Sequence, residues 1–520
     1  MPRRPLTLAV CLAACAACPA PRQSPAAPPT SAPPPLAAAA LVPADAPLVL
    51  LARDLSRVVL TLRSLAGAAG RSPGGIDRAL RRDLGLSLIA PGDLRRAGIA
   101  LQGSAALYGS GLDLTLVLPV KDPARLRTFA NAPAGGESYW VWREAEGRRI
   151  SLALVGKHLL ANVTALTTAG DRADGQPAGA WLGETVKILR GQRPALAGPR
   201  LASWLERVGA GRDLVGALQP LPLNRASSML GERLGQPRDA ARCDALDHDL
   251  VRARLLLAGL QLGDREAGGT LRVDLDADTR GVLAGAAAHQ VTLPAELWDH
   301  APARVRMSVP YREIAQLARR IPHRPGCGAV SDLLAALDPR ETVIRMELLA
   351  NVDGRVAAAL TGLAVEGDRL RTRGAALAPP PRPPASRLLA LLLAGPWARQ
   401  ERVAGRTVHR VSAPAFLSGT LRIRLDRWMR LTIGEGVMQP LVDYNPPRDG
   451  PPMLLAARLE PGPLDLDALA RSPLAARFRA SELLAGLARF RLLALEARLA
   501  PHGLRVDFSW RLARRAGAEP

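Results

Sequence analysis

Alternation of apolar and polar residues predicts short β-strands along much of the chain. Residues 254–274 alternate on both sides of a Gly-rich turn at 263–269, and residues 492–507 alternate on both sides of a turn at 501–503. A period of two interrupted by a Gly- or Pro-containing turn is typical of a β-hairpin. The tetrapeptide Leu-Arg-Val-Asp lies in the second strand of both. Each half of the chain is therefore predicted to end in a hairpin.

The beginnings of the two halves also share a pattern. Residues 41–64 contain a Pro-Ala-acid triplet, then Ala-Pro, an extended apolar run and a predicted amphipathic helix, and residues 292–321 repeat this plan. Ala46-Pro47 and Ala301-Pro302 stand just before the predicted strands, where the missing N–H of proline costs least. Because both the beginnings and the ends correspond, the sequence predicts two tandem, duplicated domains.

The segments between these markers predict further strands and a helix. The expected elements are a strand at 112–120, a helix at 123–129, strands at 139–143, 149–155 and 159–163, and strands of the second half at 408–411, 421–426 and 430–433. Consecutive strands joined by tight turns form antiparallel sheets. The predicted fold class is therefore α+β, with two antiparallel-sheet domains, 41–290 and 291–520, and helices packed on one face of each sheet.

The first residues carry an export pattern. Arg3 and Arg4 precede an apolar run from Leu6 to Ala17. A positive start, a short apolar run and small residues predict a signal peptide, at residues 1–14. The run is shorter than the roughly 20 residues that cross a bilayer, so it does not predict a transmembrane helix.

The stretch Leu12-Ala13-Ala14-Cys15 resembles the lipobox of bacterial lipoproteins. The resemblance implies that the chain is cut before Cys15 and that a diacylglycerol on the sulfur holds the protein to the membrane. Cys11 and Cys18 fit the motif worse, and Cys18 has no assigned role. Ala16 is not the aspartate that retains such proteins at the inner membrane, so the resemblance implies the outer membrane more than the inner one. A signal peptide without lipid is the alternative.

A segment rich in proline and alanine follows the lipobox. Residues 19–40 consist almost wholly of Pro, Ala and Ser. This composition cannot bury a core and favours extended polyproline II structure. We therefore expect residues 15–40 to be the lipidated cysteine and a tether of about 3 Å per residue.

Composition and charge limit the classes of molecule that the protein is expected to bind. Hydrophobic residues make up 48% of the chain but aromatic residues only 3%, too few for a carbohydrate platform or a base-stacking surface. The net charge is +22, and the arginines are scattered among acidic residues. Such scattering is typical of a solvated surface. We expect anionic lipids or polymers of the envelope near the protein, and no nucleic acid.

Two short motifs match catalytic sites only in part. Cys11, Cys15 and Cys18 have a C-x₃-C-x₂-C spacing similar to the cluster site of radical S-adenosylmethionine enzymes, but Cys11 is discarded with the signal peptide. Residues 70–74 match the G-x-S-x-G motif of serine hydrolases. Pro73 follows the serine, however, and has no N–H for an oxyanion hole. Neither motif predicts catalysis.

A third motif has the spacing of a calcium loop, at Asp274, Asp276 and Asp278. Thr279 stands where such a loop needs glycine, and Gly285 where it needs glutamate. Residues 271–277 alternate between apolar and polar, so we interpret them as a half-buried strand and expect no metal there.

Two cysteines lie in the globular part, Cys243 and Cys327. An oxidising compartment favours a disulfide between them. His248 and His323 lie close by in sequence and would complete a Cys₂His₂ zinc site, although the spacing is not that of known zinc sites. The disulfide, two free thiols and the zinc site stay open as alternatives, and no metal is predicted.

In its general plan the chain resembles uncharacterised bacterial envelope proteins that carry a lipobox, a tether and duplicated α+β domains. The sequence lacks a Walker A loop, an H-E-x-x-H motif and a dinucleotide fingerprint. It therefore predicts a membrane-anchored envelope lipoprotein with a non-catalytic binding, scaffold or assembly role. We expect no cofactor besides the covalent lipid on Cys15, and an envelope protein or an anionic polymer as partner. The rivals are an envelope hydrolase with a site built from distant residues, and a lipid- or polymer-binding module with an apolar cavity or an arginine cluster.

Overall fold

The computed structural model describes residues 36–68, 86–87, 90–110, 113–131, 139–145, 148–165, 180–233, 250–263, 265–287, 291–308, 355–366, 369–381, 385–412, 417–447, 453–472 and 481–513, with the single residues 78, 81, 243, 244, 247, 383 and 475. The chain forms two compact units. The described residues up to Asp276 belong to unit 1, and those from Ala277 belong to unit 2.

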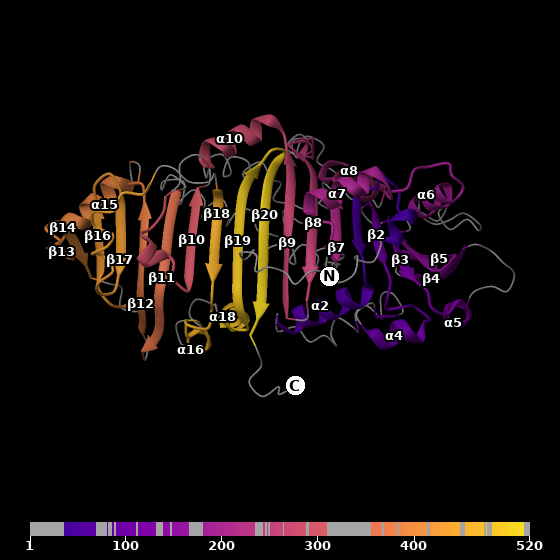
Figure 1. Cartoon of the computed structure of the whole chain (residues 1–520), viewed down its shortest axis with the longest axis horizontal. Coiled ribbons are helices and arrows are strands. Elements are labelled where there is room, and N and C mark those ends of the chain that lie inside the picture. Colours follow the sequence, from indigo (N-terminus) through magenta and orange to yellow (C-terminus); the bar gives the residue numbers. More distant parts are fainter. Residues whose placement is uncertain are drawn as a thin grey trace. The chain divides into compact units, whose positions relative to one another are not determined.

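Unit 1 is built on an antiparallel sheet (Figure 1). Its strands are β1 (Leu48–Ala52), β2 (Ala105–Ser110), β3 (Asp113–Pro119), β4 (Tyr139–Ala145), β5 (Arg148–Val155), β6 (His158–Ala165), β7 (Leu214–Leu218), β8 (Ala253–Leu262) and β9 (Glu266–Leu275). Their order in the sheet is β4-β5-β6-β3-β2-β1-β7-β8-β9, and every neighbouring pair is antiparallel. The first strand of the unit therefore lies in the middle of its sheet.

Helices cover both faces of the unit 1 sheet. The 3₁₀-helix η1 (Ala37–Leu41), α6 (Ala180–Leu189) and α7 (Pro199–Val208) pack on one face, and α2 (Leu55–Ala68), α4 (Pro91–Arg96) and α5 (Pro123–Phe129) pack on the other. Helix α8 (Pro220–Arg233) follows β7. The prediction of helices on one face was wrong for this unit. The strands of this sheet bury side chains on both faces. Leu51, for example, belongs to the hydrophobic cluster on one face, and its neighbour Ala52 belongs to the cluster on the opposite face.

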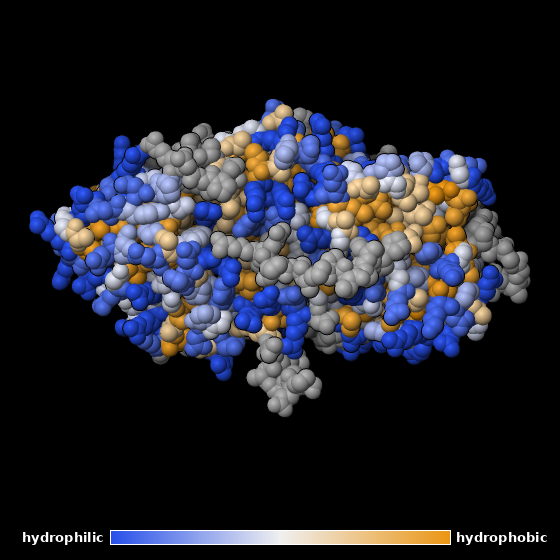
Figure 2. Space-filling view, viewed as in Figure 1, coloured by the Kyte–Doolittle hydropathy of each residue, from blue (hydrophilic) through white to orange (hydrophobic). Residues whose placement is uncertain are grey.

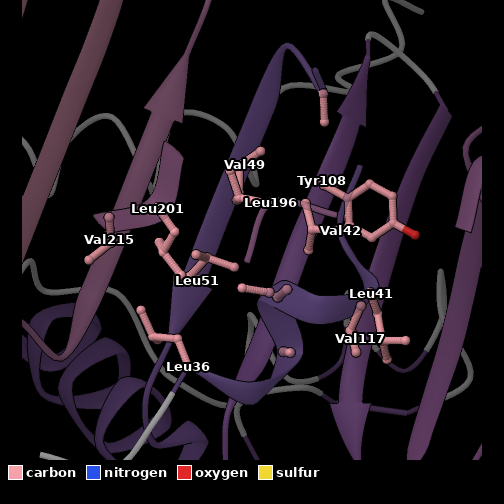
Figure 3. Packing of buried hydrophobic residues seen from close by; sticks show 14 of the residues in the cluster. Leu36, Leu41, Val42, Val49, Leu51, Tyr108, Val117, Leu196, Leu201 and Val215 are labelled. Atoms are coloured by element: carbon pink, nitrogen blue, oxygen red, sulfur yellow. The ribbon is translucent and has the colours of Figure 1, made fainter. Parts of the chain in front are cut away.

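The packed part of unit 1 begins before residue 41. Figure 3 shows Leu36 near Leu51 of β1 and Leu41 near Val117 of β3, and all four belong to one hydrophobic cluster. Ser104 Oγ accepts a hydrogen bond of 2.8 Å from the backbone N–H of Ala38. Residues 36–40, which the composition assigns to the tether, are thus part of the core.

Unit 2 also contains an antiparallel sheet. Its strands are β10 (Ala303–Ser308), β11 (Arg355–Glu366), β12 (Arg369–Ala378), β13 (Ala398–Val403), β14 (Arg406–Val411), β15 (Leu417–Ser418), β16 (Leu421–Leu425), β17 (Met429–Ile433), β18 (Met453–Leu459), β19 (Phe490–Ala500) and β20 (Gly503–Leu512). Their order is β13-β14-β16-β17-β12-β11-β10-β18-β19-β20, and the short β15 adds a parallel pairing to β12. From β14 to β20 this order repeats the strand order of unit 1 position by position, with β13 added at the edge.

The helices of unit 2 within the described residues are α10 (Ala277–Ala287), α11 (Ala295–Trp298), α15 (Ala385–Ala394), α16 (Leu466–Arg471) and α18 (Ser481–Ala488). Helix α11 packs on the face that buries alanines of β11 and β12, whereas α16 and α18 pack on the opposite face. Helix α10 packs on β18 and β19. Hydrophilic residues cover most of unit 2 in Figure 2, with small hydrophobic patches between them.

Most of the local predictions agree with the structure, but the turn expected at 263–269 was too long, because β9 already begins at Glu266. The expected hairpins are β8–β9 and β19–β20, and the Ala-Pro dipeptides come directly before β1 and β10. The strand and helix expected at 112–129 are β3 and α5. The helix expected after β10 lies outside the described residues. The α+β fold class is confirmed.

Candidate functional site

The candidate site is an apolar groove of 460 Å³ on the unit 2 sheet. It lies on the face where α16 and α18 pack. Side chains from β10, β11, β12, β17, β18 and β19 form its floor: Ala303, Val305, Ala358, Leu360, Ala376, Leu431, Ile433, Ala457, Leu459 and Leu493.

Strand register explains the hollow. One row of side chains runs across five strands. Each residue of the row lies directly opposite the next on the neighbouring strand, in the order Ala457, Val305, Ala358, Ala376 and Leu431. Successive side chains of a strand alternate between faces, so this row lies on one face of the sheet. Its alanines project little from the backbone, while Leu431 ends the row with a larger side chain. Small residues on adjacent strands therefore form the floor.

A second row lies two residues further along each strand, on the same face of the sheet. It runs from Leu459 through Ala303 and Leu360 to Gly374 and then Ile433. Gly374 is needed because a Cβ there would lie 2.7 Å from the carbonyl oxygen of Ala359. The close approach of these two strands deepens the groove beside Leu360.

Helices α16 and α18 pack against residues of the groove floor. Leu464, Leu466 and Leu469 are buried there and form a cluster with Ala303 and Leu360 of the groove floor. Asp465 caps α16, since its carboxylate accepts a hydrogen bond from the N–H of Ala468.

The groove has no charged side chain on its floor. Arg304 and Arg458 contribute backbone atoms, because alternation directs their side chains to the opposite face. Arg304 lies there over the ring of Trp298 at 5.6 Å and donates to the carbonyl oxygens of Trp298 and Asp299, and Arg458 pairs with Glu460. The strand N–H and C=O groups are used in the sheet. An aliphatic ligand therefore fits this floor better than a polar one.

The predicted lipidation site lies outside the described residues. This applies to Leu12, Ala13, Ala14 and Cys15, and to Cys11 and Cys18. The G-x-S-x-G match at 70–74 lies outside them too.

Cys243 of the predicted disulfide is buried and disulfide-bonded. Cys327 lies outside the described residues, so the pairing of Cys243 with Cys327 stays a prediction.

The acidic triplet lies where β9 gives way to α10. Asp274 is in β9 and pairs with Arg207. Strand β9 ends at Leu275 and α10 begins at Ala277, so the prediction of a strand to residue 277 was wrong at its end. Asp278 lies in the first turn of α10 and Asp274 in β9. Within the ranges given above, no three metal-ligating side chains lie together.

No hydrolase site is found in the part of the chain that the structure describes. The described histidines are His158, His300, His409 and His502, and none of them forms a hydrogen bond with a serine, threonine or cysteine there. Burial lowers the pKa of His158, which favours its neutral form. A nucleophile, base and orienting acid are not brought together among these residues.

Sequence reasoning did not find the groove. The signal was present as the small residues at 357–359 and 456–457, which stand among aliphatic ones. Only the pairing of distant strands places these residues in one row.

The comparisons with known proteins give no family. No family model and no curated protein matches the chain. Among solved structures, crystal form I of TP0453 matches with 11% identity and a TM-score of 0.25, covering 48% of this chain and 81% of that one. Crystal form III matches with 9% identity and a TM-score of 0.24, covering 49% and 87%. Such scores are too low to support an argument. Within the described residues, no helix has the length and apolar character needed to cross a bilayer.

Proposed function

We propose that this chain is a membrane-anchored envelope lipoprotein that binds an aliphatic chain in the groove of unit 2 without catalysing a reaction. The single observation that carries the proposal is the groove, with its wholly aliphatic floor. Each methylene that moves from water into it contributes about 0.8 kcal/mol. The lipobox resemblance at Cys15 supports the location, with the outer membrane favoured over the inner one.

A fluorescent fatty acid tests the binding. We expect the full chain with Cys15→Ala to enhance its fluorescence and to release it when an unlabelled fatty acid is added. Ala358→Trp fills the floor of the groove and is expected to reduce the binding at least tenfold. Lys157→Trp, on an exposed turn of unit 1, is the matched control and should bind as before.

Equal fatty-acid binding by Ala358→Trp and the control would refute the proposal. Circular dichroism of both variants shows whether the Trp is tolerated in the sheet. If Ala358→Trp does not fold, Ala376→Leu provides a smaller filling of the same row.

Acyl labelling tests the anchor. The unaltered chain is expected to take up labelled palmitate and to sediment with membranes. Cys15→Ala should lose the label and leave the membrane fraction, while Cys18→Ala keeps both. A palmitate label that persists in Cys15→Ala would refute the lipobox assignment.

We also propose that the two units arose by duplication. The repeated strand order supports this. A second support is a matching hydrogen bond after each Ala-Pro dipeptide. Gln219 N donates to Pro47 O at 2.7 Å, and Glu460 N donates to Pro302 O at 2.6 Å. Homologous sequences in which the two halves align with each other through these prolines would test the duplication.

A further inference from the structure

Helix α15 and the residues that follow it expose large apolar side chains. Leu388 is 61% exposed, Leu391 70%, Leu392 44% and Trp397 52%. Nine large hydrophobic side chains are exposed in the described part of the chain, and these four lie within residues 388–397. Single exposed leucines are ordinary, but a cluster marks an interaction surface.

The helix presents these leucines together. Leu388, Leu391 and Leu392 stand three and four residues apart, which places them on one side of the helix. Leu393 is buried beneath them and holds the helix to the protein. The exposed side of α15 is thus apolar by sequence, because only Arg387 interrupts it.

Trp397 is held beside the end of the helix. Its indole Nε1 donates a hydrogen bond of 2.7 Å to the carbonyl oxygen of Leu392. Gly395 makes room for the ring, since a Cβ there would lie 2.7 Å from it. The ring is therefore fixed in position although half of it is exposed.

Exposed arginines adjoin this apolar surface. Helix α15 contacts β13, and Arg399 and Arg410 are exposed on one face of the β13–β14 hairpin. Arg399 and Arg410 are direct cross-strand partners. Like charges directly opposite each other destabilise a sheet unless an anion lies between them. In the described part of the chain, neither of these two arginines forms an ion pair.

We propose that α15 and the β13–β14 hairpin form a docking surface for a bilayer rich in anionic phospholipid. Leu388, Leu391, Leu392 and Trp397 enter the interface between headgroups and acyl chains, as the apolar face of an interfacial helix does. Tryptophan favours this depth because its ring is apolar and its N–H is polar. The arginines contact lipid phosphates.

The charge pattern favours an anionic bilayer over a second protein. An apolar protein partner would need no cluster of arginines, whereas an anionic membrane surface complements both the leucines and the charge. Each arginine near such a surface strengthens binding about fivefold. The inference goes beyond the aliphatic-ligand function and does not depend on it.

Vesicle sedimentation tests the surface without the covalent anchor. The full chain with Cys15→Ala is mixed with vesicles of phosphatidylcholine alone, or of equal parts phosphatidylcholine and phosphatidylglycerol. We expect binding to the mixed vesicles that weakens in high salt, and little binding to phosphatidylcholine. Leu391→Asp should reduce the binding more than tenfold. Leu60→Asp is the matched control, because Leu60 is 52% exposed on α2 of unit 1.

Three results would overturn the inference. They are equal sedimentation with both kinds of vesicle, unchanged binding of Leu391→Asp, and a dimer in light scattering that Leu391→Asp converts to a monomer without a change in vesicle binding. The last would identify a second copy of the chain as the occupant. Arg399→Gln with Arg410→Gln is a second test and should lower binding to the mixed vesicles about 25-fold, if each arginine contributes fivefold. Fatty-acid binding in the groove is measured separately, so failure of one proposal leaves the other intact.

Discussion

Replacing Asp93 by asparagine should weaken unit 1 at neutral pH but not in acid. Asp93 is buried, and its carboxylate accepts hydrogen bonds from Arg81 Nε at 2.6 Å, from Arg96 and from the N–H of Ser87 at 3.2 Å. The hydrogen bond from Arg81 is the largest cause that lowers the pKa of Asp93 to about 2 from 3.8. The carboxylate thus stabilises the fold when it is charged.

The pKa sets the size and sign of the effect. A pKa lowered by about 1.8 units corresponds to about 2.4 kcal/mol at neutral pH. Arg81 and Arg96 are 47% and 76% exposed, so solvent screens them, and we expect about 1–2 kcal/mol. Because the folded pKa is the lower one, this stability is present above pH 3.8 and is lost as the pH falls towards 2.

Urea unfolding of the Cys15→Ala chain measures this difference. Asp93→Asn should unfold at lower urea than its parent at about pH 7, and the two should converge near pH 2. Asp299→Asn is the control, because Asp299 is exposed. A gap between Asp93→Asn and its parent that stays constant from pH 7 to pH 2 would refute the electrostatic reasoning.

Three further changes test the packing. Tyr108→Phe removes a buried hydroxyl that bonds Thr185 and should cost about 1 kcal/mol in urea unfolding. Burial raises the pKa of Tyr108 to about 12, so its phenol should ionise well above pH 10 in an ultraviolet titration compared with that of Tyr108→Phe; ionisation near pH 10 would contradict this burial. Gly374→Ala places a Cβ 2.7 Å from Ala359 O and should cost about 1–3 kcal/mol, and an unchanged unfolding midpoint would contradict the close approach. Removal of residues 36–41 should lower the melting temperature of unit 1, whereas removal of residues 19–35 should leave it unchanged.

The sequence predicted those elements whose signals are local. The β19–β20 hairpin was predicted because its two alternating strands and its turn lie in one continuous segment, residues 490–512. Helix α5 was predicted because Asp122 and Pro123 mark its beginning. The helices on both faces of the unit 1 sheet were not predicted. A strand such as Leu48–Ala52 is apolar on both sides, so its sequence does not alternate and does not show which face the helices cover. The strand order was not predictable from these patterns, because it depends on pairing between distant segments.

The candidate surfaces show the same limit. The leucines of α15 all lie within residues 388–393. A leucine-rich helix is usually buried, however, and only the structure shows that Leu391 is exposed. The alanines of the groove floor lie in one row only because four strands from separate parts of the chain, β18, β10, β11 and β12, pair with one another. Residues 36–40 look like more tether by composition and become part of the core only through contact with the sheet of unit 1.

The central place of β1 has a consequence for the order of folding. β1 is the first strand of unit 1 to be synthesised, yet one of its two neighbours, β7, begins at Leu214. The nascent chain therefore carries the apolar segment Leu48–Ala52 without its complete set of partners while the next 160 residues or so are made. Pairing between such distant segments folds slowly, and an unpaired apolar strand aggregates readily. A chaperone that shields this segment until β7 emerges would have its greatest effect on the yield of folded protein.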